Sequence, residues 1–167
     1  RPMSACSRPA HGLRERKDSV MLRYVLFLLS EYYYMIMEPR FHEVRDKVSS
    51  HQVEAVLRKF SPGSADAGGA CLAETLIITD EPQAAREMLT AGGYVVILYH
   101  EKNRHLEFPS VRYGVEDVFM LEYQSYEEAY KRLAGLPWDI LETDRLRVRE
   151  STVEDVDEFY RIYKEPS

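Results

Sequence analysis

Asp80 follows a short apolar run, and this position makes it the first residue that could do chemistry. The run "LIIT" (76–79) is typical of a fully buried strand, so Thr79 and Asp80 would lie at its carboxyl end. Open α/β sheets bind ligands at that edge, and a carboxylate there can hold a metal ion or a phosphate-bound magnesium. A ligand pocket at Thr79 and Asp80 is therefore one hypothesis. The favoured prediction is that Asp80 caps the next helix, with Gln83 completing a capping box.

A metal centre or a catalytic site would need further groups near Asp80, and the sequence offers few. Metal sites need several converging carboxylate, His or Cys ligands at set spacing, yet Ala84 and Ala85 stand where a second carboxylate could help. His100 and His105 share a polar loop, a pattern of low specificity. The chain contains no Gly-x-Gly-x-x-Gly fingerprint, phosphate-binding loop or Gly-x-Ser-x-Gly elbow. We predict no catalytic, cofactor-binding or metal-ligating residue in it.

The elements that would position Asp80 form a small α/β unit over residues 71–139. Buried apolar runs separated by a helix and tight turns indicate parallel strands joined by a right-handed crossover. Glycines that follow the helices are typical stop signals. The expected elements are a strand at 76–79, a helix over 80–91 ended by Gly92 and Gly93, a strand at 94–100, a short strand at 111–115, and a helix capped by Ser125 and stopped by Gly135.

The part of the chain before this unit is predicted to be helical. Residues 20–37 form an apolar run of about the minimum length for a membrane span. Arg23 and Glu31 lie inside it, and a charge in mid-span costs about 2.5–3.5 kcal/mol, so we predict a buried helix of a soluble protein instead. Apolar residues at 53, 56, 57 and 60 have the spacing of another amphipathic helix. We expect two or three helices over 20–60, acting as a layer on the sheet or as a partner-binding surface.

Composition favours a folded soluble protein that does not bind nucleic acid. The 167-residue chain has a formal net charge of −6 and no basic stripe, which argues against binding to a phosphate backbone. Its two cysteines, Cys6 and Cys71, suit neither a disulfide framework nor a zinc site, so we expect a cytoplasmic location. We expect no membrane partner, and the oligomeric state stays open. Residues 1–19 are predicted to be disordered or an upstream segment, and 61–70 a linker.

Two stretches of the α/β unit resemble a known scaffold. "LIITDEPQAAREMLTAGGYVVILYHEKN" and "VRYGVEDVFML" are similar to the second half of a haloacid-dehalogenase-like (HAD-like) Rossmann unit. That family places an Asp-x-Asp nucleophile motif after a strand, but this chain has Asp80, Glu81 and Pro82. The family's later acidic pair is reduced to Asp80 alone. The resemblance therefore implies a degenerate HAD-like scaffold without phosphatase chemistry.

The stretch "GLPWDILETDRLRVRESTVEDVDEFYRIY" resembles the entry to a GCN5-related N-acetyltransferase (GNAT) domain. The family opens with an "ETxRLxxR" strand and a capped helix, so the resemblance implies a strand at 145–150 and a helix at 153–164. The order of parts also resembles bacterial acetyltransferases that carry an N-terminal extension. Glu142, Thr143, Arg145, Leu146 and Arg149 match the strand motif, Thr152 and Asp155 match the cap, and Val156, Phe159, Tyr160 and Tyr163 give the helix an apolar face.

The GNAT resemblance implies a parent enzyme that transfers an acetyl group from acetyl-CoA to an amine. The family holds acetyl-CoA with a Gly-rich loop that feeds a helix N-terminus, and no such loop occurs in these 167 residues. We therefore expect residues 140–167 to be the start of a truncated GNAT domain, and the chain alone to be inactive. The alternative is a non-enzymatic HAD-like module that binds a ligand or a partner. The amine acceptor stays open.

Overall fold

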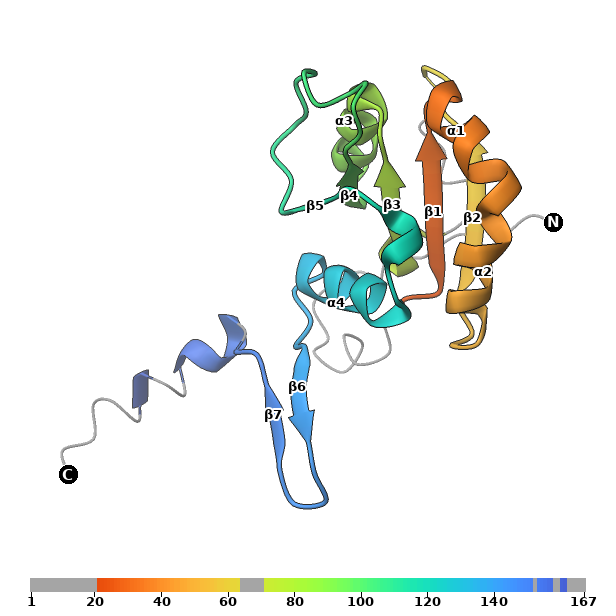
Figure 1. The fold of residues 1–167 in the computed structure, drawn as a ribbon. Coiled ribbons are helices and arrows are strands. Elements are labelled where there is room, and N and C mark those ends of the chain that lie inside the picture. The colour runs from red at the N-terminus through yellow and green to blue at the C-terminus, as the bar shows by residue number, and fades with distance from the viewer. Residues whose placement is uncertain (1–20, 64–70, 152, 158–159, 162–167) are drawn as a thin grey trace.

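A parallel β-sheet forms the centre of the molecule. The computed structural model describes residues 21–63, 71–151, 153–157 and 160–161. The sheet is five-stranded and comprises β1 (Tyr24–Leu29), β2 (Glu54–Lys59), β3 (Thr75–Thr79), β4 (Tyr94–Leu98) and β5 (Tyr113–Val115). The strands pair in the order β2-β1-β3-β4-β5, and every pair is parallel (Figure 1). This arrangement confirms the predicted α/β class with a parallel sheet.

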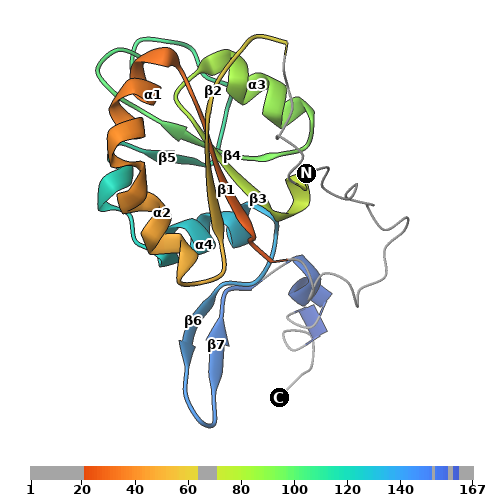
Figure 2. The ribbon, with the colours of Figure 1, turned by 90° about the vertical axis from the view of Figure 1, so that its right-hand side faces the viewer.

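Helices cover both faces of the sheet, as all-parallel sheets require. The helices α1 (Glu31–Met37), α2 (Phe41–Ser49) and α4 (Tyr123–Leu133) pack on one face, and α3 (Pro82–Thr90) packs on the other (Figure 2). Successive side chains of each strand point to opposite faces, so every strand contributes to both layers of the core. The central strands are therefore apolar on both sides.

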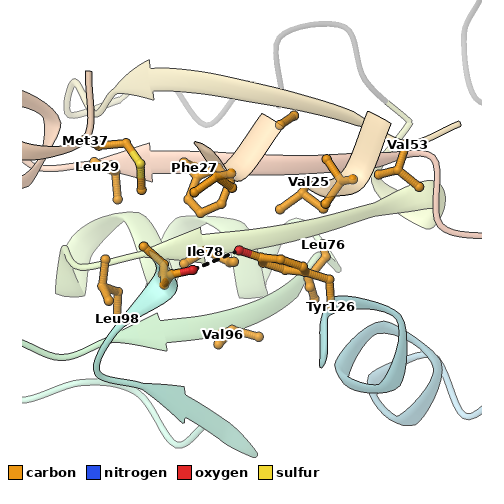
Figure 3. Packing of buried hydrophobic residues seen from close by; sticks show 14 of the residues in the cluster. Val25, Phe27, Leu29, Met37, Val53, Leu76, Ile78, Val96, Leu98 and Tyr126 are labelled. Atoms are coloured by element: carbon orange, nitrogen blue, oxygen red, sulfur yellow. Dashed lines mark hydrogen bonds between the residues drawn. The ribbon is translucent and has the colours of Figure 1, made fainter. Parts of the chain in front are cut away.

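The face under α1, α2 and α4 holds the larger part of the core (Figure 3). Phe27 of β1 meets Tyr126 of α4 edge-on, with ring centroids 6.4 Å apart. Fully burying a large apolar side chain of this kind stabilises the fold by about 1.5–3 kcal/mol. The hydroxyl of Tyr126 donates a hydrogen bond to the carbonyl oxygen of Val118 at 3.4 Å, so the ring is buried with its polar atom satisfied.

Two segments that were predicted as helices are strands. The apolar run at 20–37 divides into β1 and α1, and β2 occupies most of the helix expected over 53–60. Short apolar runs do not distinguish a strand from a buried helix by periodicity, and both faces of β1 are buried, which removes the alternation of an exposed strand. Ser30 ends β1 and caps α1, because its side-chain oxygen accepts a hydrogen bond from the amide of Tyr33 at 3.4 Å. Strands from both sides of the expected linker therefore share one sheet.

The expected elements from β3 to α4 are confirmed, with small shifts at their ends. Gly92 follows α3 with φ 86° and Gly135 follows α4 with φ 71°, the left-handed conformation that ends helices. The predicted cap at Ser125 is wrong, because α4 begins at Tyr123, with Glu122 as its N-cap residue.

A β-hairpin follows α4 and lies outside the parallel sheet (Figure 1). Its antiparallel strands are β6 (Asp139–Glu142) and β7 (Arg147–Arg149), so the strand expected at 145–150 is present but shorter. The helix expected at 153–164 begins as the 3-10 turn Val153–Asp155. The predictions for 1–19, for most of the linker, and for Thr152, Phe159 and Tyr163 fall outside the described residues. Within the described part of the chain, no helix is long and apolar enough to cross a bilayer.

Candidate functional site

Three side chains meet at the carboxyl edge of the sheet, where the strand order reverses. The chain leaves β1 for β2 on one side, while β3 lies on the other side of β1. Ser30 follows β1, Asp80 follows β3, and His100 comes two residues after β4. Doubly wound sheets bind their ligands at such switch points. Asp80 therefore lies at the edge where the sequence placed it, with two partners that the sequence did not indicate.

The carboxylate of Asp80 is enclosed, with only 2% of the residue exposed. Its Oδ1 accepts a hydrogen bond from the backbone amide of Ser30 at 2.7 Å. Its Oδ2 accepts two more, from the Ser30 hydroxyl and from Nε2 of His100, the latter at 2.8 Å. A buried carboxylate is tolerated only when donors of this kind satisfy it. Asp80 therefore ties the ends of β1, β3 and the β4 loop together.

The interpretation of Asp80 as the cap of α3 is wrong. The N-cap residue is Glu81, and its side chain makes no capping hydrogen bond. The hydroxyl of Thr79 instead accepts a hydrogen bond from the amide of Glu81 at 3.1 Å. Gln83, the other half of the predicted capping box, donates to Glu87 on the exposed side of the helix at 3.2 Å. The side chain of Asp80 reaches the donors at Ser30 because Ser30 directly follows β1, the strand beside β3.

The neighbours of His100 hold it in one tautomer. The backbone amide of Lys102 donates to Nδ1 of His100 at 3.2 Å, so Nδ1 is the acceptor nitrogen. The proton of the neutral ring is therefore on Nε2, which donates to Asp80. Tyr33 stacks on the imidazole with centroids 5.4 Å apart and planes 14° from parallel. Burial of the side chain is the largest cause that raises the pKa of Tyr33, and the negative charges of Asp117 and Asp80 raise it further. The phenol is therefore neutral at physiological pH.

The side chain of Asn103 also belongs to this network, through hydrogen bonds to backbone groups. Its side-chain amide donates to the carbonyl oxygens of Leu98 at 2.7 Å and Asp80 at 3.0 Å. Its side-chain oxygen accepts a hydrogen bond from the amide of His100 at 2.7 Å. With 2% of its surface exposed, Asn103 satisfies three backbone groups that water does not reach. The loop after β4 is therefore fixed against the end of β3.

This arrangement fixes strand ends rather than activating a nucleophile. In a Ser-His-Asp triad the imidazole lies between the other two and accepts the serine proton. Here Asp80 lies in the middle, and both Ser30 and His100 donate to the same oxygen. Both nitrogens of His100 are engaged, so neither is free to act as a base. The carboxylate of Asp80 is likewise enclosed and cannot meet a substrate without opening the network.

The other sequence candidates do not join this network. Thr79 is fully buried, and its hydroxyl is used by the Glu81 amide. His105 is exposed on the loop after β4. Among the described residues, no group of three or more His, Cys, Asp or Glu side chains is placed to hold a metal ion. Ser30 and Asn103 were missed. A strand assignment for 24–29 would have placed Ser30 at the same edge as Asp80.

Comparisons with protein-family models, with curated proteins and with solved structures gave no match.

A cluster of charges joins the hairpin to α4. Arg132 near the end of α4 pairs with Glu150 after β7 through two hydrogen bonds, one of them 3.1 Å long, and with Glu128 at 2.7 Å. The hydrogen bond to Glu150 is the largest cause that raises the pKa of Arg132, and a hydrogen bond to Tyr113 raises it further. The guanidinium is therefore charged at physiological pH. The amide of Glu150 donates to the carbonyl oxygen of Trp138 at 2.9 Å. Arg132 therefore links the sheet unit to the hairpin through polar contacts.

Arg132→Ala is expected to loosen the hairpin while the sheet stays intact. The bidentate link to Glu150 is lost, but the backbone pairing of β6 with β7 is not. Amide hydrogen exchange over 139–150 should become several-fold faster, since segments with few anchors open at low cost. Exchange in β1 and β3 should stay the same. Arg104→Ala, which removes an exposed pair with Glu116, is the control. Unchanged exchange in the hairpin would contradict the role of Arg132.

Proposed function

We propose that this chain is the N-terminal region of a GNAT-type N-acetyltransferase, whose parent transfers an acetyl group from acetyl-CoA to an amine. One observation carries the proposal: the "ETDRLRVR" segment forms a hairpin separate from the parallel sheet and leaves its apolar side chains uncovered. A soluble domain does not normally leave so many apolar side chains exposed in one segment. The exposed residues of the hairpin and the turn after it are Ile140, Leu146, Val148, Val153, Val156 and Tyr160.

The residues of the motif have definite contacts in this hairpin. The hydroxyl of Thr143 accepts hydrogen bonds from the amides of Leu146 at 3.1 Å and Arg145 at 3.4 Å, which closes the turn. Arg149 makes two hydrogen bonds to Asp155, at 2.8 and 2.9 Å. The last residue of the strand motif therefore pairs with the acidic residue of the cap motif. These contacts support the reading of the two motifs as one folding unit.

The acetyl-CoA of such an enzyme would be held by residues outside this region. A pyrophosphate site needs a Gly-rich loop whose backbone amides open a helix. The five described glycines are placed otherwise: Gly92, Gly93 and Gly135 follow the ends of helices, Gly114 lies in β5, and Gly63 lies in the turn after β2. The described residues thus do not fit the group. In this proposal the sheet unit is a non-catalytic accessory module, and the chain alone does not acetylate. Cys71 is disulfide-bonded, so the expectation of unpaired cysteines is wrong, and it no longer supports a cytoplasmic location.

The codons that follow those of this 167-residue chain in the gene test the proposal. We expect a Gly-rich loop followed by a helix within about 100 residues, the length of a typical domain. A frame that continues without such a loop would contradict the acetyltransferase proposal.

The second candidate is a non-enzymatic HAD-like module that binds a ligand or a partner. The parallel sheet with Thr79 and Asp80 at its switch point favours it, because ligands of doubly wound sheets bind there. The saturated carboxylate of Asp80 argues against a ligand at that point unless the network opens. This candidate takes precedence if the downstream frame encodes no acetyltransferase.

A further inference from the structure

We propose that a pocket between α4 and the sheet binds a small, uncharged and largely apolar molecule with one hydroxyl group. The pocket has a volume of about 220 Å³ and lies on the side of the sheet opposite α3. It is separate from the network around Asp80, since the two share no residue. Its principal lining residues are Leu76, Ile78, Val96, Val115, Tyr126 and Ala129.

The floor of the pocket is rigid and apolar. Leu76 and Ile78 of β3 and Val96 of β4 form it, and each is at most 5% exposed (Figure 3). These strands pair within the sheet on both sides, so the floor cannot collapse without disturbing the sheet. Tyr126 forms part of the wall, and its hydroxyl is held by the carbonyl oxygen of Val118. The pocket is therefore preformed.

The space over Leu76, Ile78 and Val96 is open because α4 has only an alanine, Ala129, at this point and because β5 is short. Ala129 of α4 contributes only a methyl group to the lining of the pocket. The strand at this edge, β5, is only three residues long, so it closes the side of the pocket incompletely. A longer side chain at position 129 would fill the space.

The size of the pocket decides the class of ligand. An apolar cavity of about 150 Å³ is enough to bind benzene. This pocket, at about 220 Å³, is somewhat larger, so it can hold a molecule with one ring and a short substituent. A protein or nucleic acid could insert only a single side chain or base of this size. Burying a ring of this size against Leu76, Ile78 and Val96 would supply the affinity.

Three polar side chains line the pocket, those of Tyr113, Ser125 and Glu128. Tyr113 and Glu128 both contact Arg132, Glu128 at 2.7 Å, and Arg132 is shared with Glu150, so the mouth offers no unshared positive charge to an anion. Ser125 is exposed at the mouth, where its hydroxyl can exchange a hydrogen bond with water for one with a ligand. A single neutral hydroxyl group on the ligand suits this environment, whereas a charged group would lose its hydration against the apolar floor of Leu76, Ile78 and Val96.

Phenol and benzene are suitable probes for titration against the full chain, monitored by amide NMR. Phenol should bind saturably and shift the amides of Val115, Tyr126 and Ala129. Ser125→Ala should weaken phenol by about fivefold, the value of one hydrogen bond, and leave benzene unchanged. Gln124→Ala, the neighbouring exposed residue of α4, should affect neither probe.

Ala129→Leu is designed to fill the pocket and should abolish binding of both probes. Ala91→Leu makes the same change at an exposed residue outside the pocket and should leave binding intact. The proposal is overturned if neither probe saturates, or if the shifts lie elsewhere on the chain. It is also overturned if these amides shift with protein concentration in the absence of a probe, because a second copy would then fill the pocket. Should Ala129→Leu not fold, the shifts in the native chain and the Ser125→Ala comparison decide alone.

Discussion

Asp80→Ala should lower the free energy of unfolding by about 2–4 kcal/mol, because three hydrogen-bond donors lose their acceptor at once. These are the amide and hydroxyl of Ser30 and Nε2 of His100. Each buried donor left without a partner costs about 1–3 kcal/mol. Ser30 and His100 are only partly buried, so water compensates for some of this loss and the total stays below the full sum. Urea unfolding followed by far-UV circular dichroism measures the change.

Asp80→Ser distinguishes the network from a helix cap. Serine is a good N-cap residue, so a cap would be largely restored by this substitution. The serine side chain is too short to reach the donors at Ser30 and His100, so we expect a loss of stability close to that of Asp80→Ala. Asp46→Ala, on the exposed face of α2, is the control and should change stability by less than about 0.5 kcal/mol. A native-like stability for Asp80→Ser would contradict the network.

Asn103→Asp should lower the free energy of unfolding by about 3–5 kcal/mol at neutral pH. The substitution replaces an amide that donates to two carbonyl oxygens with a carboxylate that repels them. The site is 2% exposed, so the new charge is not hydrated. Urea unfolding at a series of pH values measures the effect.

The pH dependence of Asn103→Asp has a definite sign. Burial beside two carbonyl oxygens favours the protonated acid and raises the pKa of the introduced carboxyl in the folded state. The penalty is therefore present above that raised pKa and disappears as the pH falls toward the unfolded value of about 4. Gln124→Glu makes the same amide-to-acid change on the exposed surface of α4 and should show no such dependence. A deficit that is equal at pH 5 and pH 8 would show that Asn103 does not face the carbonyl oxygens.

The sequence predicts elements well where several local signals agree. α3 was found because Pro82 lies at its start, Gly92 follows its end, and buried strands flank it. β1 was missed because an apolar run at the centre of a parallel sheet carries no alternation, and α1 follows it after one residue. The edge strand β2 was missed for a different reason, because the apolar residues at 53, 56, 57 and 60 have the spacing of a helix face.

The contacts of the candidate site depend on strand order, which local patterns do not contain. The position of Asp80 at a carboxyl edge followed from the apolar run before it. Its partner Ser30 is 50 residues away and becomes adjacent only because β1 lies beside β3. A local helix cap was the simpler prediction, since it needs no knowledge of the sheet. Asn103 lies in a polar loop, and nothing in its neighbours indicates that it is buried.

We propose that the hairpin opens an acetyltransferase domain and that the sheet unit is its non-catalytic companion. Titration calorimetry with acetyl-CoA tests this most directly, on the 167-residue chain and on the product of the complete reading frame. We predict that the complete product binds acetyl-CoA and acetylates an amine in a panel of acceptors, and that the 167-residue chain does neither. Absence of binding in the complete product, or turnover by the 167-residue chain that survives repurification, would contradict the account.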